Sequence, residues 1–251
     1  MKIAALYDIH GNFPALQAVL KELHYLQPDV IVIGGDIVSG PMPVQTLDCL
    51  LNLRRDAKVT FIRGNGDREV SEASKGLGLK NLSEQGQKTE QWVAEQLTEK
   101  HIEFLSHLKS VASIQTELGD LLFCHATPMS DSDIFTPQSN KKRLEKIFGN
   151  VEQSIVVCGH THVQFKLKFE KKLIFNSGSI GMPYAKQTGA YWLFISPDGI
   201  QFKRTSYDLN EAAKLFRQSN SPSVEDFINN NLFHIPTEKE AMAFFNKITE
   251  K

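Results

Sequence analysis

Five short polar motifs in the sequence combine carboxylate, imidazole and amide side chains, which are common metal ligands. In chain order they are Asp8-Ile9-His10, Gly35-Asp36, Gly64-Asn65, His125 and Gly159-His160-Thr161-His162. Residues two apart in an extended chain point to the same side. Asp8 with His10, and His160 with His162, can therefore each aim two ligands at one point.

The chemistry of these side chains indicates a dinuclear metal site. Oxygen and nitrogen ligands suit borderline divalent ions such as Mn²⁺, Fe²⁺, Zn²⁺ or Ni²⁺ better than a thiolate site would. The motifs supply seven ligands, too many for one tetrahedral zinc ion. They fit two ions about 3.5 to 4 Å apart that share one carboxylate, as in enzymes that cleave phosphoryl bonds.

Each motif follows an apolar run of strand length. The runs cover residues 3–7, 30–33, 59–62, 121–124 and 155–158. In an open α/β sheet the carboxyl ends of the strands line the ligand crevice. We therefore expect the five motifs to converge on one edge.

The first part of the chain alternates strand-length and helix-length segments, which is typical of βαβ units around a parallel sheet. Residues 13–26 and 47–53 have the period of helices, while residues 63–67 indicate a Gly-punctuated loop. Residues 82–108 are polar with a helical period, so a helical insertion is expected over about 68–110.

The second half is richer in strands, several of them hairpin partners. Beyond the two runs named above, strands are predicted over residues 111–115, 163–169, 173–176, 191–195 and 200–204.

The C-terminal part carries three helix-capping signatures beyond Ser206. They are Asp208 ahead of Glu211, Ser223 ahead of Asp226 and Thr237 ahead of Glu240. Each precedes apolar residues at helical spacing, so two or three short helices are expected. They either cap the active-site rim or only pack on a sheet edge or flanking helix, and we expect packing alone.

Composition excludes several classes of protein. The 251 residues are 41% hydrophobic and 23% charged, which argues against a disordered, collagen-like or disulfide-scaffold chain. With 28 basic and 29 acidic residues, nothing marks a nucleic-acid partner. No apolar run reaches the roughly 18 residues of a membrane span. Three cysteines without a CxxC spacing, and a strand instead of a signal peptide at the start, indicate a cytoplasmic location.

The five motifs, in this order and each after an apolar run, resemble the signature of the calcineurin-like metallophosphoesterases: Asp-x-His, Gly-Asp, Gly-Asn, His and Gly-His-x-His. The resemblance spans about residues 1–205. It implies an α/β fold with a two-sheet αββα sandwich. We therefore expect a metallophosphoesterase domain over residues 1–205 and a C-terminal helical extension, 206–251, packed on the same domain.

The resemblance also implies a role for each ligand. Asp8, His10 and His162 would hold one metal, Asn65, His125 and His160 the other, and Asp36 would bridge them. Asp36, Asn65 and His125 would thereby also be catalytic. The implied cofactors are two divalent ions, Mn²⁺ first, with Fe, Zn, Ni or Mg as alternatives.

One position departs from the family pattern. In many members a His that protonates the leaving oxygen follows the Asn, whereas Gly66 stands there in this chain. The chain most resembles a bacterial and archaeal phosphodiesterase-like branch that also lacks this His.

Three further residues are candidates for contact with substrate. Arg68 could offer its guanidinium fork to a phosphate, an exposed structural arginine being the alternative. Asp67 resembles the family's acidic residue that orients the motif. Asn12 is placed near the active site by the resemblance, or orients its own loop by a turn hydrogen bond.

The predicted function is a dinuclear metal-dependent phosphoesterase that hydrolyses phosphodiester or phosphoanhydride bonds by in-line attack of a metal-bridging hydroxide. Its substrate would be a phosphate ester or a nucleotide. The alternatives are a phosphomonoesterase or protein phosphatase, and a catalytically silent protein-binding module of the same fold. All seven ligand positions are present, which favours the enzyme.

Overall fold

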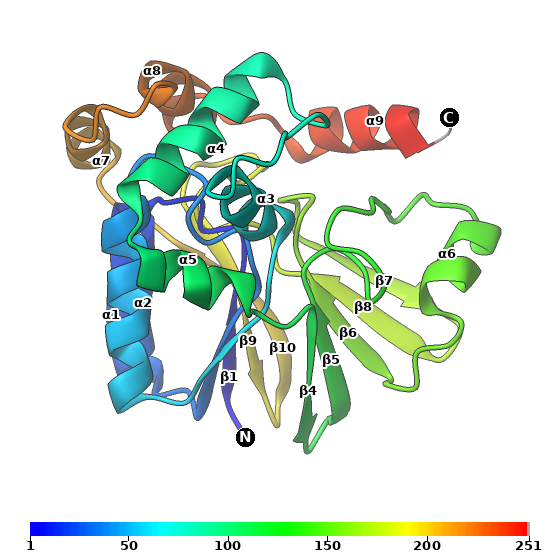
Figure 1. The fold of residues 1–251 in the computed structure, drawn as a ribbon. Helices are drawn as coiled ribbons and strands as arrows, with labels where there is room; N and C mark the ends of the chain where they lie inside the picture. Colours follow the sequence, from blue (N-terminus) through cyan, green and yellow to red (C-terminus); the bar gives the residue numbers. More distant parts are fainter. Residues whose placement is uncertain (250–251) are drawn as a thin grey trace.

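A computed structural model describes residues 1–249, and its first sheet carries the first three motifs. The strands are β1 (Ile3–Leu6), β2 (Val30–Ile33), β3 (Val59–Phe61), β9 (Ala190–Ser196) and β10 (Gly199–Thr205). Their order is β10-β9-β1-β2-β3 (Figure 1). Strands β1, β2 and β3 run parallel, so their carboxyl ends meet at one edge.

The second sheet carries the last two motifs and faces the first (Figure 1). Its strands are β4 (Val111–Thr116), β5 (Gly119–Cys124), β6 (Ile155–Cys158), β7 (Phe165–Phe169) and β8 (Lys172–Asn176). The order is β4-β5-β6-β8-β7, with β5, β6 and β8 parallel and the two edge strands antiparallel. The predicted αββα sandwich is thus confirmed.

Alternation along β1 divides the core into two layers. Ile3, Ala5 and Tyr7 are buried between the sheets, whereas Ala4 and Leu6 are buried beneath the helices on the other face. Because successive strand side chains point to opposite faces, a strand buried on both sides must be apolar throughout.

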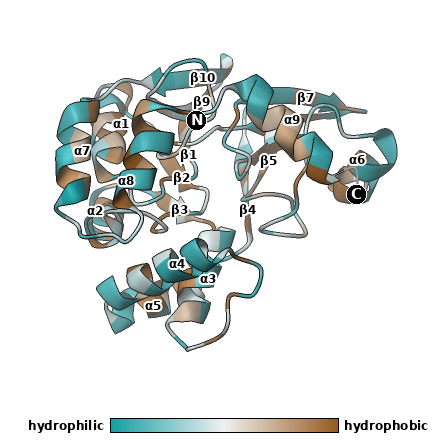
Figure 2. Ribbon diagram, turned by 90° about the horizontal axis from the view of Figure 1, so that it is seen from above, coloured by the Kyte–Doolittle hydropathy of each residue, from teal (hydrophilic) through white to brown (hydrophobic). Residues whose placement is uncertain are grey.

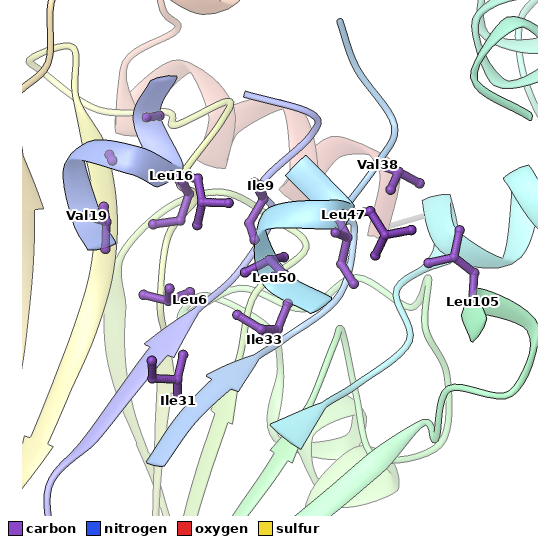
Figure 3. Packing of buried hydrophobic residues seen from close by; sticks show 14 of the residues in the cluster. Leu6, Ile9, Leu16, Val19, Ile31, Ile33, Val38, Leu47, Leu50 and Leu105 are labelled. Carbon is purple, nitrogen blue, oxygen red and sulfur yellow. The ribbon is translucent and has the colours of Figure 1, made fainter. Parts of the chain in front are cut away.

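Helices α1 (Phe13–Leu26) and α2 (Pro43–Asp56) cover the outer face of the first sheet. Figure 3 shows Leu16 of α1 and Leu50 of α2 close to Leu6 of β1, within one buried cluster. Each helix connects one parallel strand to the next, so all three strands run in the same direction and end at the same edge of the sheet.

The insertion after β3 contains α3 (Asn65–Ala73), α4 (Glu84–Gln96) and α5 (Glu99–Ser106), which gather together in Figure 2. The prediction of a loop over residues 63–67 is wrong in its second half. Asn65 is the first residue of α3, because the Asp67 carboxylate accepts the backbone N–H of Gly64 and caps the helix start.

The remaining helices follow the second half of the chain. Helix α6 (Lys141–Phe148) packs on the outer face of the second sheet. The C-terminal part forms α7 (Leu209–Arg217), α8 (Val224–Phe227), the π-helix η1 (Ile228–Phe233) and α9 (Glu238–Thr249). Figure 2 shows α7 and α8 beside α1 and α2, and α9 near the second sheet. Within residues 1–249, no helix combines the length and apolarity needed to cross a bilayer.

Candidate metal centre

The predicted ligands meet at the edge where β1, β2, β5 and β6 end. One cluster contains Asp8, His10 and His162, and the other contains Asp36, His125 and His160. Within each cluster the candidate ligand atoms lie within 4.8 Å of one another. Asn65, the first residue of α3, joins the second cluster with its amide oxygen 3.2 Å from Nε2 of His125.

Three of the histidines are oriented by the backbone. Nδ1 of His10 lies 3.1 Å from the Ser39 carbonyl, that of His125 2.9 Å from Gly34, and that of His162 2.8 Å from Met182. A carbonyl oxygen can only accept, so Nδ1 carries a proton in each ring. Nε2 is thereby turned toward the clusters, which is how proteins orient metal-binding imidazoles.

Buried electron-rich atoms in the first cluster fit a cation. Nε2 of His10 lies 3.2 Å from Nε2 of His162, so at most one proton can satisfy both. Oδ1 of Asp8 is buried, 3.3 Å from Nε2 of His162, and has no hydrogen-bond partner within residues 1–249. A buried carboxylate oxygen left unpaired is costly, and a divalent ion between these atoms would remove that cost.

The second cluster fits a cation for the same reason. The amide oxygen of Asn65 faces Nε2 of His125 at 3.2 Å, Nδ1 of His160 at 3.1 Å and the carbonyl of Asp131 at 3.2 Å. Rotating the amide would turn its NH₂ group toward these acceptors. A bound cation would instead satisfy the oxygen where it is.

Asp36 lies between the two clusters. Its Oδ2 is 3.7 Å from Nε2 of His10 in the first cluster and 3.5 Å from Nε2 of His125 in the second. Its Oδ1 accepts the backbone N–H of Gly66 at 2.7 Å. This is the place that a shared carboxylate would occupy.

The ligand backbone is held in an unfavourable conformation. Asp8, His10, Asp36, His160 and His162 have φ of 53°, 50°, 50°, 68° and 57°. They make up five of the eight non-glycine residues with positive φ within residues 1–249. Such residues cost about 1 to 3 kcal/mol each and persist where the surrounding structure enforces them, typically at functional sites.

The charges of the site reflect its burial and its acidic groups. Burial lowers the pKa of His125, but the carboxylates of Asp36 and Asp8 outweigh burial and raise it to about 10. Burial and the nearby His125 lower the pKa of His160 to about 4. The two carboxylates thus favour a positive charge at this point of the site, and a divalent cation would supply it.

Asp67 orients the site and has no oxygen free for substrate. It is fully buried, and its carboxylate accepts the backbone N–H groups of Asp36, Ile37 and Gly64 at 3.0, 2.9 and 2.9 Å. These bonds tie the Asp36 loop to the start of α3. The orienting role from the family resemblance fits this geometry, and the proposed contact with substrate does not.

We expect Asp67→Asn to lower the free energy of unfolding by about 1 to 3 kcal/mol, because the amide NH₂ would face a backbone N–H and leave buried donors unpaired. Denaturant unfolding would measure this loss. Asp120→Asn, at an exposed position of β5, is the control and should stay unchanged. Unaltered stability with only a raised KM for Asp67→Asn would restore the substrate-contact role.

Arg68 is bound by carboxylates of the protein. Its Nε and Nη2 donate to the two oxygens of Asp131 at 2.9 and 3.2 Å, and Nη1 donates to Glu72. This bidentate pair uses the guanidinium fork that could otherwise have bound a substrate phosphate. The structure therefore supports the alternative, a structural arginine.

Asn12 also has a structural position. Its Oδ1 accepts the Ala15 N–H at 3.1 Å and caps α1, while its Nδ2 donates to the Gly181 carbonyl and the Tyr207 hydroxyl. The side chain is fully buried. Asn12 therefore orients its own loop, and its amide oxygen and nitrogen are both engaged within the protein.

A cavity of about 450 Å³ opens beside His10, Asp36, Asn65 and Gly66. Most of its other walls come from the Ser39 loop, α4 and the segment 221–231, which the metal-ligand motifs do not indicate. Phe227 and Asn231 of the C-terminal segment line this cavity, which favours the alternative that these helices cap the active-site rim. No sequence motif marks Phe227 or Asn231, because what they share is only their position in the fold.

Ser39 and Glu90 fill the space next to Gly66. A Cβ atom at Gly66 would collide with the Ser39 hydroxyl, so a side chain does not fit there without a shift. The hydroxyl donates to Glu90 at 3.0 Å. Burial raises the pKa of Glu90 to about 8, so a neutral acid lines the cavity at neutral pH.

Comparisons with known proteins agree with this geometry. The family model described as calcineurin-like phosphoesterase superfamily domain matches residues 1–196. The chain is 25% identical over 233 residues to an uncharacterized protein of Methanocaldococcus jannaschii, across 84% of this chain and 89% of that protein.

Two solved structures share the fold. One is a hypothetical protein of Pyrococcus horikoshii, with a TM-score of 0.81, 20% identity and coverage of 94% of this chain and 99% of that one. The other is a metallophosphoesterase of Sphaerobacter thermophilus, with a TM-score of 0.73, 21% identity and the same coverage of 94% and 99%.

Proposed function

Because the chain belongs to the calcineurin-like phosphoesterase superfamily, we propose that it is a dinuclear metal-dependent enzyme that hydrolyses phosphodiester or phosphoanhydride bonds. The observation that supports this most is the pair of ligand clusters on either side of Asp36. The five positive φ angles add support. A silent binding module would have no need to retain that strain.

The residues divide between two cations as follows. Asp8, His10 and His162 would hold one, Asn65, His125 and His160 the other, and Asp36 both. Two divalent cations would supply a nucleophilic hydroxide near neutral pH and take up charge on the phosphoryl oxygens. We propose Mn²⁺ first, with Fe, Zn, Ni or Mg as alternatives, since carboxylate, amide and imidazole ligands suit this group.

The protein itself contributes rigidity and a low dielectric. Asp8 and His125 are almost completely buried, which strengthens every charge interaction around the phosphoryl group. Backbone carbonyls fix three imidazole rings, and Asp67 fixes the loop that carries Asp36. Substrate would enter from the cavity beside Gly66, which His10 and Asp36 line.

We expect purified protein to contain up to two divalent ions per chain and to hydrolyse bis(p-nitrophenyl) phosphate only when loaded with metal. Metal at 100 times its dissociation constant should add about 2.7 kcal/mol per site to the free energy of unfolding. Elemental analysis, thermal unfolding and hydrolysis with and without chelator and Mn²⁺ would test this. Full hydrolysis by metal-free protein would refute the proposal.

A further inference from the structure

The cavity beside the metal centre has a second wall built from two distant parts of the chain. Helix α4 and the residues before it contribute Leu82, Gln85 and Thr89, and the C-terminal segment contributes Ser223 and Asn231. Figure 1 shows α8 next to α4 at the top of the molecule. A volume of about 450 Å³ is in the usual range of small-molecule sites.

Hydrogen bonds lock the two parts of this wall together. The Ser223 hydroxyl lies 2.6 Å from Gln85 Nε2, which donates to it, and 2.6 Å from the hydroxyl of Thr89. Apolar packing of Phe227 against Phe216 holds α8 on α7. The wall is thus a fixed part of the cavity.

One polar group of this wall, the side chain of Asn231, comes from a π-helix. Asn231 lies in η1 (Ile228–Phe233), which follows α8 directly. Segments of π-helix are rare and often occur at functional sites. Asn231 is half-buried and lines the cavity, whereas Asn229 of the same segment is exposed and does not.

The charge of the cavity argues against additional phosphate groups. Among the residues that the structure describes, no lysine or arginine lines it, and Arg68 is paired with Asp131. Besides Asp36, the carboxyl groups of Glu69 and Asp226 line it, together with the neutral acid of Glu90. A polyphosphate chain would need cationic partners, and here it would meet acids.

The lining also argues against a quaternary ammonium group. Such a cation is usually enclosed by several Trp, Tyr or Phe rings, and Phe227 is the single residue of these types that lines the cavity within residues 1–249. What the wall offers instead is a set of hydroxyl and amide groups. These groups donate and accept hydrogen bonds to neutral hydroxyls.

We infer that the wall formed by α4 and the segment 221–231 is a binding subsite for an uncharged, hydroxyl-rich alcohol group of a phosphodiester substrate, such as glycerol or a ribose. This inference rests on the proposed function. Of the two bond types named there, phosphodiesters and phosphoanhydrides, it selects phosphodiesters. The phosphoryl group would lie at the metal centre and the alcohol group against Asn231, on the wall that the bonded pair of Ser223 and Gln85 holds in place.

The test compares four substrates of the Mn²⁺-loaded full-length protein. They are bis(p-nitrophenyl) phosphate, glycerophosphoglycerol, glycerophosphocholine and diadenosine tetraphosphate. We expect glycerophosphoglycerol to have the lowest KM. Diadenosine tetraphosphate or glycerophosphocholine as the best-bound substrate would overturn the inference. Hydrolysis of no substrate, bis(p-nitrophenyl) phosphate included, would instead refute the proposed function.

Variants separate the subsite from the metal centre. Asn231→Ala should lower kcat/KM for glycerophosphoglycerol, relative to that for bis(p-nitrophenyl) phosphate, by about three- to tenfold, the effect of one lost hydrogen bond to a neutral group. Asn229→Ala is the matched control, because its side chain is exposed and outside the cavity. Equal ratios in the wild type and Asn231→Ala, with unchanged thermal stability, would overturn the inference.

Discussion

Replacing Asp36 by Asn is expected to lower metal-dependent hydrolysis by about 100-fold or more, the largest loss for any single residue. Asp36 lies between the two clusters, with Oδ2 3.7 Å from Nε2 of His10 and 3.5 Å from Nε2 of His125. Asn has the same size but no negative charge to share. A poorly held metal pair would lose several kcal/mol of charge stabilisation in the transition state.

The measurements are kcat/KM at saturating Mn²⁺ and the metal content of the variant. His24→Ala is the control, because His24 is exposed on α1, away from the site, and its replacement should leave metal content unchanged. The bridging role would be wrong if Asp36→Asn kept more than about a tenth of wild-type activity, since a shared ligand cannot be lost at so small a cost.

Gly40→Ala is expected to produce the second largest effect, although residue 40 is not a ligand. A Cβ atom there would overlap the carbonyl oxygen of His10 and lie 2.5 Å from its carbonyl carbon. Neither atom can move without shifting the backbone that directs His10 toward the first cluster. We expect a destabilisation of about 1 to 3 kcal/mol, typical of overpacking, and loss of metal from the first cluster.

Metal content, hydrolysis and denaturant unfolding of Gly40→Ala would be measured together. Gly78→Ala is the matched control, because its Cβ would meet no atom nearer than 4.0 Å. This control should be neutral or slightly stabilising, since alanine restricts the unfolded chain. Wild-type metal content and activity in Gly40→Ala would show that the close approach of the two backbones is not needed for the site.

The backbone strain at the ligands distinguishes an enzyme from a silent module, because the two predict different effects of metal on stability. Asp8, His10 and Asp36 keep positive φ while their side chains converge. If a metal ion stabilises the unpaired ligand atoms of the two clusters, metal-free protein should be less stable than metal-loaded protein, as proposed above. A module without metals would instead gain stability from replacing these residues, since the strain would serve no purpose.

Much of the fold follows from local patterns in the sequence. Helix α1 runs over the predicted residues 13–26, because an Asn cap, an apolar stripe and the following Pro28 all lie within one short segment. The strands that precede the five motifs were also predicted, with ends shifted by a few residues. Their convergence follows from parallel pairing, which brings the carboxyl ends of neighbouring strands to one edge.

The first turn of α3 shows where local patterns fail. Residues 63–67 contain two glycines, which predict a loop, yet Asn65 begins a helix. Asp67 supplies the reason, since it caps this helix and also accepts N–H groups from residues 36 and 37. Two of these three bonds span 31 and 30 residues in sequence, so they leave no local signature.

The sequence by itself therefore determined the order of the elements, the family and the set of candidate ligands, because periodicity, caps and motif spacing are properties of short segments. Only the tertiary structure decided what surrounds the ligands. Arg68 meets Asp131 across 63 residues and Gln85 meets Ser223 across 138. Such contacts depend on how whole layers pack, so neither the pairing of Arg68 nor the second wall of the cavity can be read from any short stretch of the chain.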